Sequence, residues 1–252
     1  MIEVDRMLEG PVDIPYVAAK LYDSISHGRI VKGTNNIRSV WLTQPTLRYD
    51  HGVLDDEIEA GGLRSELAGG RSMEYQLGSR YFFEDLVPRL AHIDSDGLDE
   101  IVLARSSLTE GAAVSVFRVD ERRIESFVVS PSIGLTYRWF NPIGATNFDA
   151  DGEMDIAVVE TPHLGKTLVI YGREAPRLKT DGRARRFSSQ VIGSTVSRMP
   201  AVIDLNGDGV KDIVLPDASR RRLMAVISDI DSNHIPDIIY GREDGIVEAI
   251  LR

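Results

Sequence analysis

The amino-acid sequence predicts an all-β fold, a β-propeller of antiparallel blades with about five blades, in a single domain over residues 1–252. Three observations lead to this prediction. Apolar runs are short and rich in β-branched residues, an acidic segment recurs four times in phase, and the repeating unit has roughly the 40 to 50 residues of a four-stranded blade. Radial closure of such blades would leave few exposed sheet edges.

The expected elements begin with an ambiguous segment, since residues 16–22 fit either a helix or an N-terminal strand. Residues 1–29 form an N-terminal segment that is a candidate for closing the ring. Residues 40–54 fit a strand, a turn and a second strand. Further strands are expected at 100–104, 113–117, 155–159, 167–171 and 212–215, because each run is bounded by Gly, Asp, Asn, Ser or Pro.

The recurring acidic segments begin at residues 92, 147, 204 and 229, and they superimpose without a gap. Positions 3, 5 and 9 of each copy are Asp, Asn or Glu, position 2 is large and apolar, and Ile follows position 9. The copies start 55, 57 and 25 residues apart, so the last unit is abbreviated. A solvated acidic surface would not keep this phase. With residues 40–54, which have no acidic loop before them, the chain contains about five units.

Oxygen ligands at positions 1, 3, 5 and 9, a backbone carbonyl at position 7 and a tight turn at position 6 can surround one hard cation, and calcium fits best. An EF-hand would need Glu at position 12, which no copy has. We therefore expect two to four calcium ions. The predicted ligands are Asn147, Asp149, Asp151, Asp155, Asp204, Asn206, Asp208, Asp212, Asp94, Asp96, Glu100, Asp229, Asp231, Asn233 and Asp237.

The four copies are unequal. Loops 147–155 and 204–212 fill every ligand position and keep Gly152 and Gly209 at the turn, whereas the first copy has His92 at position 1 and the last has His234 in place of the glycine. The alternative for any single copy is a hairpin whose carboxylates cap their own backbone N–H groups. Four copies in phase favour cation binding over that alternative.

The pattern Asp-x-Asp/Asn-x-Asp-Gly-x-x-Asp followed by Ile-Val resembles the calcium loops of FG-GAP or VCBS repeats, over about residues 88–245. Such repeats are known from integrin α-subunit propellers and from many bacterial secreted or periplasmic proteins. The resemblance implies calcium loops between the first and second strands of each blade, on the face opposite the usual ligand surface. Integrin-like members usually have seven blades, which 252 residues can hardly supply.

The turns between the second and third strands of successive units vary in chemistry, which is typical of a binding surface on a repeated scaffold. The candidate ligand-binding residues in these turns are Arg48, Arg105, Glu160, His163 and Asp217. Residues 49–51, Tyr-Asp-His, are interpreted as a polar hairpin tip, with sugar binding as the alternative. Trp41 and Trp139 are interpreted as core residues.

Composition narrows the function classes. With 29 Lys and Arg against 39 Asp and Glu, the formal charge of −10 argues against nucleic acid and anionic lipid as partners. The chain has no cysteine, which excludes thiolate chemistry, and no stretch is long and apolar enough to insert into a membrane. Its first residues lack the features of a secretory signal.

Two functions therefore remain. The first is a calcium-binding, non-catalytic module for a glycan or protein ligand in an extracytoplasmic setting, periplasmic or secreted, where calcium is abundant. The second is a propeller-type polysaccharide lyase or another carbohydrate-active enzyme, for which no base and no cation-neutralising pair stand out in the sequence.

Overall fold

A computed structural model describes residues 16–18, 23–94, 96–174, 176–195, 200–227, 237–241 and 247–250. These residues contain strands, turns and bends but no helix, which confirms the all-β prediction. The five strands expected from β-branched runs are all present. The second strand expected within residues 40–54 is not, because the strand Ile37–Thr46 is followed by turns and bends and the next strand begins at Glu59. Within the described part of the chain, no helix has the length and apolar character needed to cross a bilayer.

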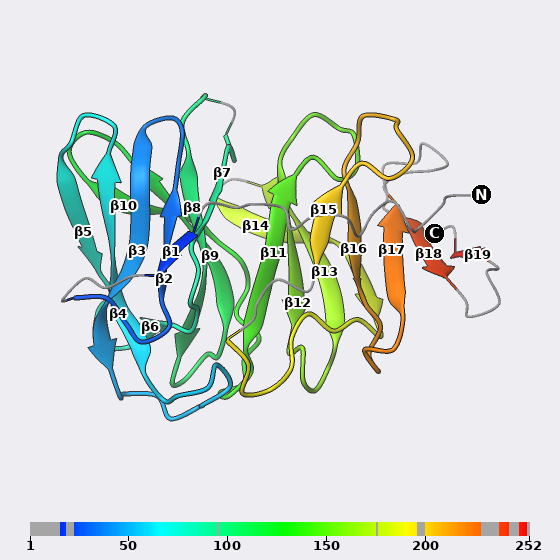
Figure 1. The fold of residues 1–252 in the computed structure, drawn as a ribbon, viewed down its shortest axis with the longest axis horizontal. Helices are drawn as coiled ribbons and strands as arrows, with labels where there is room; N and C mark the ends of the chain where they lie inside the picture. Colours follow the sequence, from blue (N-terminus) through cyan, green and yellow to red (C-terminus); the bar gives the residue numbers. More distant parts are fainter. Residues whose placement is uncertain are drawn as a thin grey trace.

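Most strands form antiparallel meanders that lie in a row (Figure 1). The first group consists of β1 (Tyr16–Ala18), β2 (Arg29–Lys32), β3 (Ile37–Thr46), β4 (Glu59–Leu67), β5 (Ser72–Gln76) and β6 (Tyr81–Phe83). The second consists of β7 (Arg89–Ala91), β8 (Glu100–Ser107), β9 (Ala113–Val119) and β10 (Ile124–Val129). The third consists of β11 (Phe140–Thr146), β12 (Asp155–Glu160), β13 (Thr167–Glu174) and β14 (Arg177–Arg185). The last consists of β15 (Ala201–Ile203), β16 (Asp212–Pro216), β17 (Leu223–Ile227), β18 (Asp237–Gly241) and β19 (Val247–Ile250).

The prediction of a propeller with about five blades is wrong. Strands β1 to β14 form one 14-stranded mixed sheet, β15 to β19 form a second sheet of five strands, and neither closes into a ring in the described residues. The physical reason is that neighbouring meanders are joined edge to edge by hydrogen bonds. Strand β6 bridges β4 to β8, and β10 pairs in parallel with β14 at Val129 and Arg177.

The N-terminal segment does not close a ring in the described residues. Residues 16–18 of the ambiguous segment form the strand β1, which pairs antiparallel with β2 at the edge of the large sheet. Residues 1–15 and 19–22 lie outside the described part of the chain.

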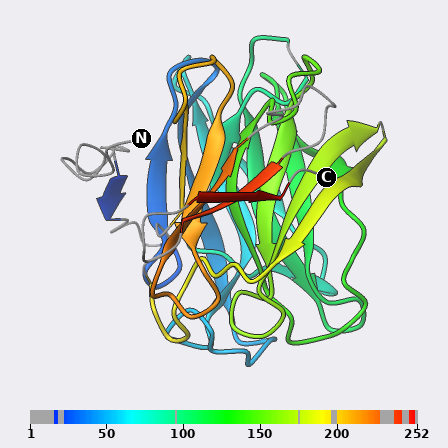
Figure 2. The same cartoon turned by 90° about the vertical axis from the view of Figure 1, so that its right-hand side faces the viewer.

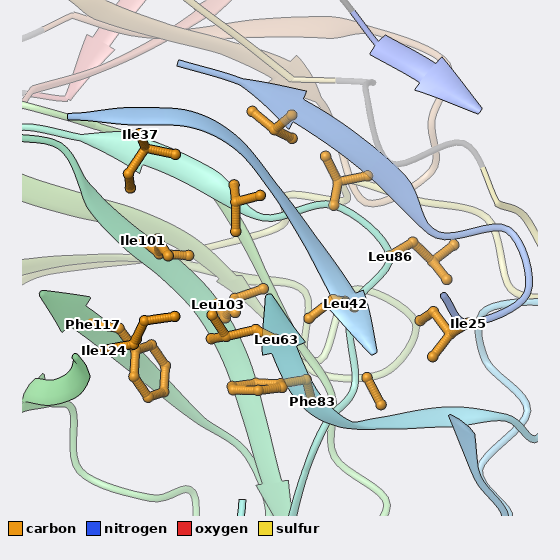
Figure 3. Packing of buried hydrophobic residues seen from close by; sticks show 14 of the residues in the cluster. Ile25, Ile37, Leu42, Leu63, Phe83, Leu86, Ile101, Leu103, Phe117 and Ile124 are labelled. Carbon is orange, nitrogen blue, oxygen red and sulfur yellow. The ribbon is translucent and has the colours of Figure 1, made fainter. Parts of the chain in front are cut away.

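Three apolar cores hold the meanders together. The first joins the β3 and β4 meander to β8 and β9, where Leu42, Leu63, Leu103 and Phe117 converge (Figure 3). The second lies between β8–β10 and β11–β13, and the third joins β12 and β13 to β16 and β17. Figure 2 shows the meanders one behind another from the β19 end. The strand ends therefore gather on two opposite faces.

Candidate calcium loops and ligand face

The three described acidic loops occupy equivalent places in the fold. They join β7 to β8, β11 to β12 and β15 to β16, so each connects two neighbouring antiparallel strands. The strand ends that these loops join lie at the upper edge of the molecule in Figure 1. The turns that follow β3, β8, β12 and β16 lie at the other ends of those strands. The acidic loops and the predicted ligand turns therefore face opposite ways.

The carboxylate at position 9 closes each loop in the same way. It accepts a hydrogen bond from the backbone N–H of position 2, seven residues earlier in the chain. The bonds run from Ile93 to Glu100, at 2.6 Å, from Phe148 to Asp155, at 2.9 Å, and from Leu205 to Asp212, at 2.7 Å. All three carboxylates are buried. This repeated bond shows that the sequence phase reflects one shared loop conformation.

Positions 3 and 5 also act alike in the three loops. The position 3 side chain accepts from the N–H of position 5, and the position 5 carboxylate accepts from the N–H of position 7. Position 6 has a positive φ in each copy, 84° at Gly97, 94° at Gly152 and 91° at Gly209, which glycine adopts without steric cost. Each of these bonds uses one side-chain oxygen of a predicted ligand.

Loop 147–155 has a buried side-chain oxygen without a partner and a carboxylate from a neighbouring strand beside it. Among the described residues, Asn147 Oδ1 is one of the few buried side-chain oxygens without a hydrogen-bond partner. Asp181 of β14 adds a carboxylate that the sequence pattern does not include. Asp181 Oδ2 lies 1.7 Å and Asp155 Oδ1 3.4 Å from the point where a Cβ on Gly172 would stand, so both oxygens border one small space.

Electrostatics of this loop show the cost of crowding acidic groups. Burial raises the pKa of Asp155 to about 7, and the charges of Asp149, Asp151 and Asp181 contribute to the rise. Burial and the Asp151 charge raise the pKa of Asp149 as well. Each raised pKa means that a negative charge on that carboxylate is unfavourable in its surroundings. A bound divalent cation would remove that repulsion, so the donor set of carboxylates and one amide oxygen fits calcium.

Loop 92–100 brings three carboxylates together but already contains a cation from the protein. The carboxylate oxygens of Asp94, Asp96 and Glu100 lie within 4.8 Å of one another. The Arg118 guanidinium forms an ion pair with Asp94. Burial opposes ionisation of Asp94, but the Asp96 N–H and Arg118 outweigh it and lower its pKa.

The histidine at position 1 of the same loop takes up a second oxygen. His92 Nδ1 lies 3.1 Å from the carbonyl oxygen of Leu98, the position 7 group that would otherwise be a backbone ligand. Burial nevertheless raises the pKa of Glu100 to about 7. Arg118 and His92 therefore occupy two of the groups that a cation in this loop would need.

In loop 204–212 the four predicted ligands bond to groups of the loop itself. Asp204 accepts the N–H groups of Gly207 and Gly209, at 2.7 Å and 3.0 Å, and Asn206 Nδ2 donates to Asp208 at 2.6 Å. Of the fourth predicted loop, only Asp237, the first residue of β18, belongs to the described part of the chain. Asp229, Asp231 and Asn233 lie outside the described residues.

The five predicted ligand-binding residues do not gather at one point. Glu160 is buried, where it accepts from the Tyr171 hydroxyl and pairs with Arg183. Asp217 caps its own turn through Ser219 and the Arg221 N–H. Arg48 donates to Thr46 and to the Tyr81 carbonyl, and the Arg105 guanidinium lies 4.3 Å from the centre of the Tyr81 ring. Of the five, only His163 lines the pocket described next.

A pocket of about 120 Å³ lies at the ligand-turn ends of the strands, and its walls come from four separate segments. The residues that matter most for its chemistry are His51, Tyr137, Trp139, Thr161, His163 and Ile192. The interpretation of residues 49–51 as a hairpin tip is wrong for two of the three, because Tyr49 is fully buried and His51 lines the pocket. Trp139 is 3% exposed and belongs to the first core, as predicted, although it also borders the pocket.

No family model matches the chain, and no curated protein matches it. Solved structures do match, and one of them is the exotype rhamnogalacturonan lyase YesX, with 13% sequence identity and a TM-score of 0.44. The alignment covers 93% of this chain and 50% of that chain, so this chain spans about half the length of that structure. At this level of similarity the likeness carries no argument about function.

Proposed function

We propose that this protein is a calcium-binding, non-catalytic glycan-binding module that works in an extracytoplasmic setting. The observation that carries the proposal is loop 147–155, where an unpartnered buried amide oxygen and four carboxylates border one loop. Loop 204–212 has the same backbone conformation and a full set of oxygen ligands. The resemblance to FG-GAP and VCBS repeats supports calcium as the cation.

Calcium has a structural role in this proposal. The loops lie at the ends of the strands opposite to the pocket, so an ion bound there does not touch the pocket's ligand. It holds the crowded carboxylates together and stiffens the hairpins on which the ligand turns are built. Loop sites of extracellular type have affinities of about 0.1 to 1 mM, which only an environment with millimolar calcium would fill.

The direct test is a glycan array probed with the purified chain in 2 mM calcium and again in EDTA. We expect binding to one group of related glycans, stronger with calcium because the filled loops stabilise the scaffold. Incubation of the bound glycans with the protein should release no product. Absence of binding to any glycan in either buffer, or cleavage of a bound polysaccharide, would contradict the proposed module.

A further inference from the structure

The pocket lies at the strand ends that carry the predicted ligand-binding turns, and ring stacking and hydrogen bonds fix its wall residues. The ring of Tyr137 stacks on that of Tyr49 with centroids 4.9 Å apart and planes 7° from parallel, and its hydroxyl donates to Asp50 at 2.7 Å. The Tyr137 N–H donates to the Tyr49 hydroxyl. Tyr137 is nevertheless 40% exposed. An aromatic ring is therefore held in one orientation with one part open to solvent.

The remaining walls are fixed as firmly. Trp139 Nε1 donates to the carbonyl of Glu84 at 2.7 Å, and the Thr161 N–H donates to the carbonyl of Trp139 at 2.8 Å. The ring of His163 stacks on that of Trp139 at 5.9 Å. Tyr137 and Thr161 both have positive φ angles, 54° and 44°, which non-glycine residues rarely adopt. Such backbone strain persists only where the surroundings impose it, and it is concentrated at functional sites.

Two imidazoles supply polar groups between these apolar walls. Nδ1 of His51 bonds to the fully buried carboxylate of Glu84, which also accepts from the Ser106 hydroxyl at 2.7 Å. This contact orients the His51 ring and leaves Nε2 as its second polar atom. His163 Nε2 is buried, and among the described residues it has no hydrogen-bond partner. A buried polar atom without a partner is costly, and a ligand hydroxyl would satisfy it.

Arg138 brings a positive charge to the pocket wall, where its guanidinium donates to the carbonyl of Tyr137 at 2.9 Å, whereas His163 is uncharged. Burial lowers the pKa of His163 to about 4, and the charges of Arg220 and His51 add to the effect, so His163 is neutral at pH 7. A neutral imidazole has one donor and one acceptor nitrogen, which suits an uncharged hydroxyl group. The Glu84 carboxylate lies beneath His51 and is not exposed.

We propose that this pocket binds one pyranose ring of a glycan, with the apolar face of the sugar against Tyr137 and its hydroxyls at His51 and His163. The cavity of about 120 Å³ suits a single ring that is partly inserted. A tyrosine side chain of a peptide also has a flat face and a hydroxyl, but it offers one hydroxyl to two imidazoles. A pyranose offers several. This inference rests on the proposed glycan-binding function and names its site.

The test is an NMR titration of the full chain with methyl glycosides of glucose, galactose, mannose and fucose, with N-acetyltyrosinamide as the peptide-type probe. Four variants accompany the wild type. Tyr137→Ala removes the stacking face, and Tyr137→Phe keeps it. His163→Phe keeps the stack on Trp139 but removes the nitrogen. Leu108→Ala alters an exposed side chain in the turn after β8, outside the pocket, and serves as the matched control.

We expect at least one glycoside to shift the indole N–H signal of Trp139. Tyr137→Ala and His163→Phe should each weaken that glycoside about tenfold, as loss of a central contact does, while Leu108→Ala changes it less than about twofold. Tyr137→Phe should weaken it less than Tyr137→Ala does, because it keeps the stacking face and loses only the hydroxyl bond to Asp50. Circular dichroism checks that each variant is folded. The inference is overturned if no glycoside binds, if the two pocket variants bind as the wild type does, or if N-acetyltyrosinamide binds more tightly than every glycoside.

Repeating the titration in EDTA and in calcium separates this inference from the proposed function. If Tyr137→Ala still binds the glycan array as the wild type does, the pocket is not the glycan site, but the proposed glycan-binding function stands. Glycoside binding at the pocket by a chain that binds no calcium would keep the pocket and refute the calcium role.

Discussion

At the scale of single residues, Asp151 and Asp96 occupy position 5 of loops with the same conformation but different surroundings. Arg118 pairs with Asp94 beside Asp96, whereas Asp181 adds a further negative charge near Asp151. In loop 92–100 the arginine therefore pairs with a predicted ligand, whereas in loop 147–155 Arg173 pairs with Glu153, which is not one of the predicted ligands.

We predict that Asp151→Ala removes one bound calcium ion and that Asp96→Ala does not change the number of ions. Asp208→Ala should behave like Asp151→Ala, because Asp208 occupies the same position 5 and accepts the same backbone N–H of position 7. Equilibrium dialysis against calcium measures the stoichiometry of each variant. Equal loss of ions from Asp96→Ala and Asp151→Ala would refute the role given to Arg118.

Ala150 has a φ of 61°, in the left-handed region, at position 4 of its loop. Loop 204–212 has Gly207 at the same position, with a φ of 81°. The left-handed conformation costs a residue with a Cβ roughly 1 to 2 kcal/mol, of which the greater chain entropy of unfolded glycine cancels about half. Ala150→Gly should therefore raise the free energy of unfolding by about 0.5 to 1 kcal/mol in urea denaturation, and a loss of stability would contradict the shared loop conformation.

Part of this residue-level account follows from the sequence and part does not. The phase of positions 3, 5, 6 and 9 predicts the loop conformation because those contacts are local in the chain. Asp181 and Arg118 contact their loops across 26 and 24 residues, from Asp155 and Asp94, through strand pairing that the pattern does not contain. The variation among the turns predicted His163 only as one of five candidate ligand-binding residues, and the partnership of Tyr49 with Tyr137 depends on segments 88 residues apart.

At the scale of elements, the β13–β14 hairpin places Gly172 and Gly182 on neighbouring strands with different surroundings. A Cβ at Gly172 would lie 1.7 Å from Asp181 Oδ2, while a Cβ at Gly182 would meet only Ile170, at 3.9 Å. Because the obstructing atom at Gly172 ends a side chain, Asp181 can swing aside without unfolding the hairpin.

We predict that Gly172→Ala and Asp181→Asn both weaken calcium binding at loop 147–155 by about tenfold, the loss of one carboxylate from the ligand set, while Gly182→Ala leaves it unchanged. Calorimetry on an Asp208→Ala background isolates the ion of this loop. If Gly182→Ala were as harmful as Gly172→Ala, the effect would come from strand geometry and Asp181 would have no part in the site.

The positions of the strands could be predicted from the sequence, but the order of the strands in the sheets could not. Runs such as 155–159 and 212–215 contain enough β-branched residues between turn formers to indicate strands. The order of those strands depends on which edges meet. The parallel pairing of Val129 with Arg177 and the short bridge through β6 make one open sheet, where the length of the repeat suggested closed blades.

At the scale of the whole molecule, the proposed calcium ions act on stability through mass action. At 1 mM calcium and affinities of about 0.1 to 1 mM, each occupied loop contributes about 0.4 to 1.4 kcal/mol. Two loops should raise the melting temperature of a chain of this size by roughly 2 to 10 °C. Differential scanning calorimetry in calcium, in magnesium and in EDTA measures the shift, and an equal rise with magnesium would refute selectivity for calcium.

The most direct test of the central claim is a calorimetric titration of calcium into EDTA-stripped protein, with an Asp151→Ala, Asp208→Ala double variant as the control. We predict that the wild type binds at least two ions and that the double variant binds two fewer, while circular dichroism of the two proteins remains the same. No heat of binding in the wild type, or the same number of ions in both proteins, would contradict the account.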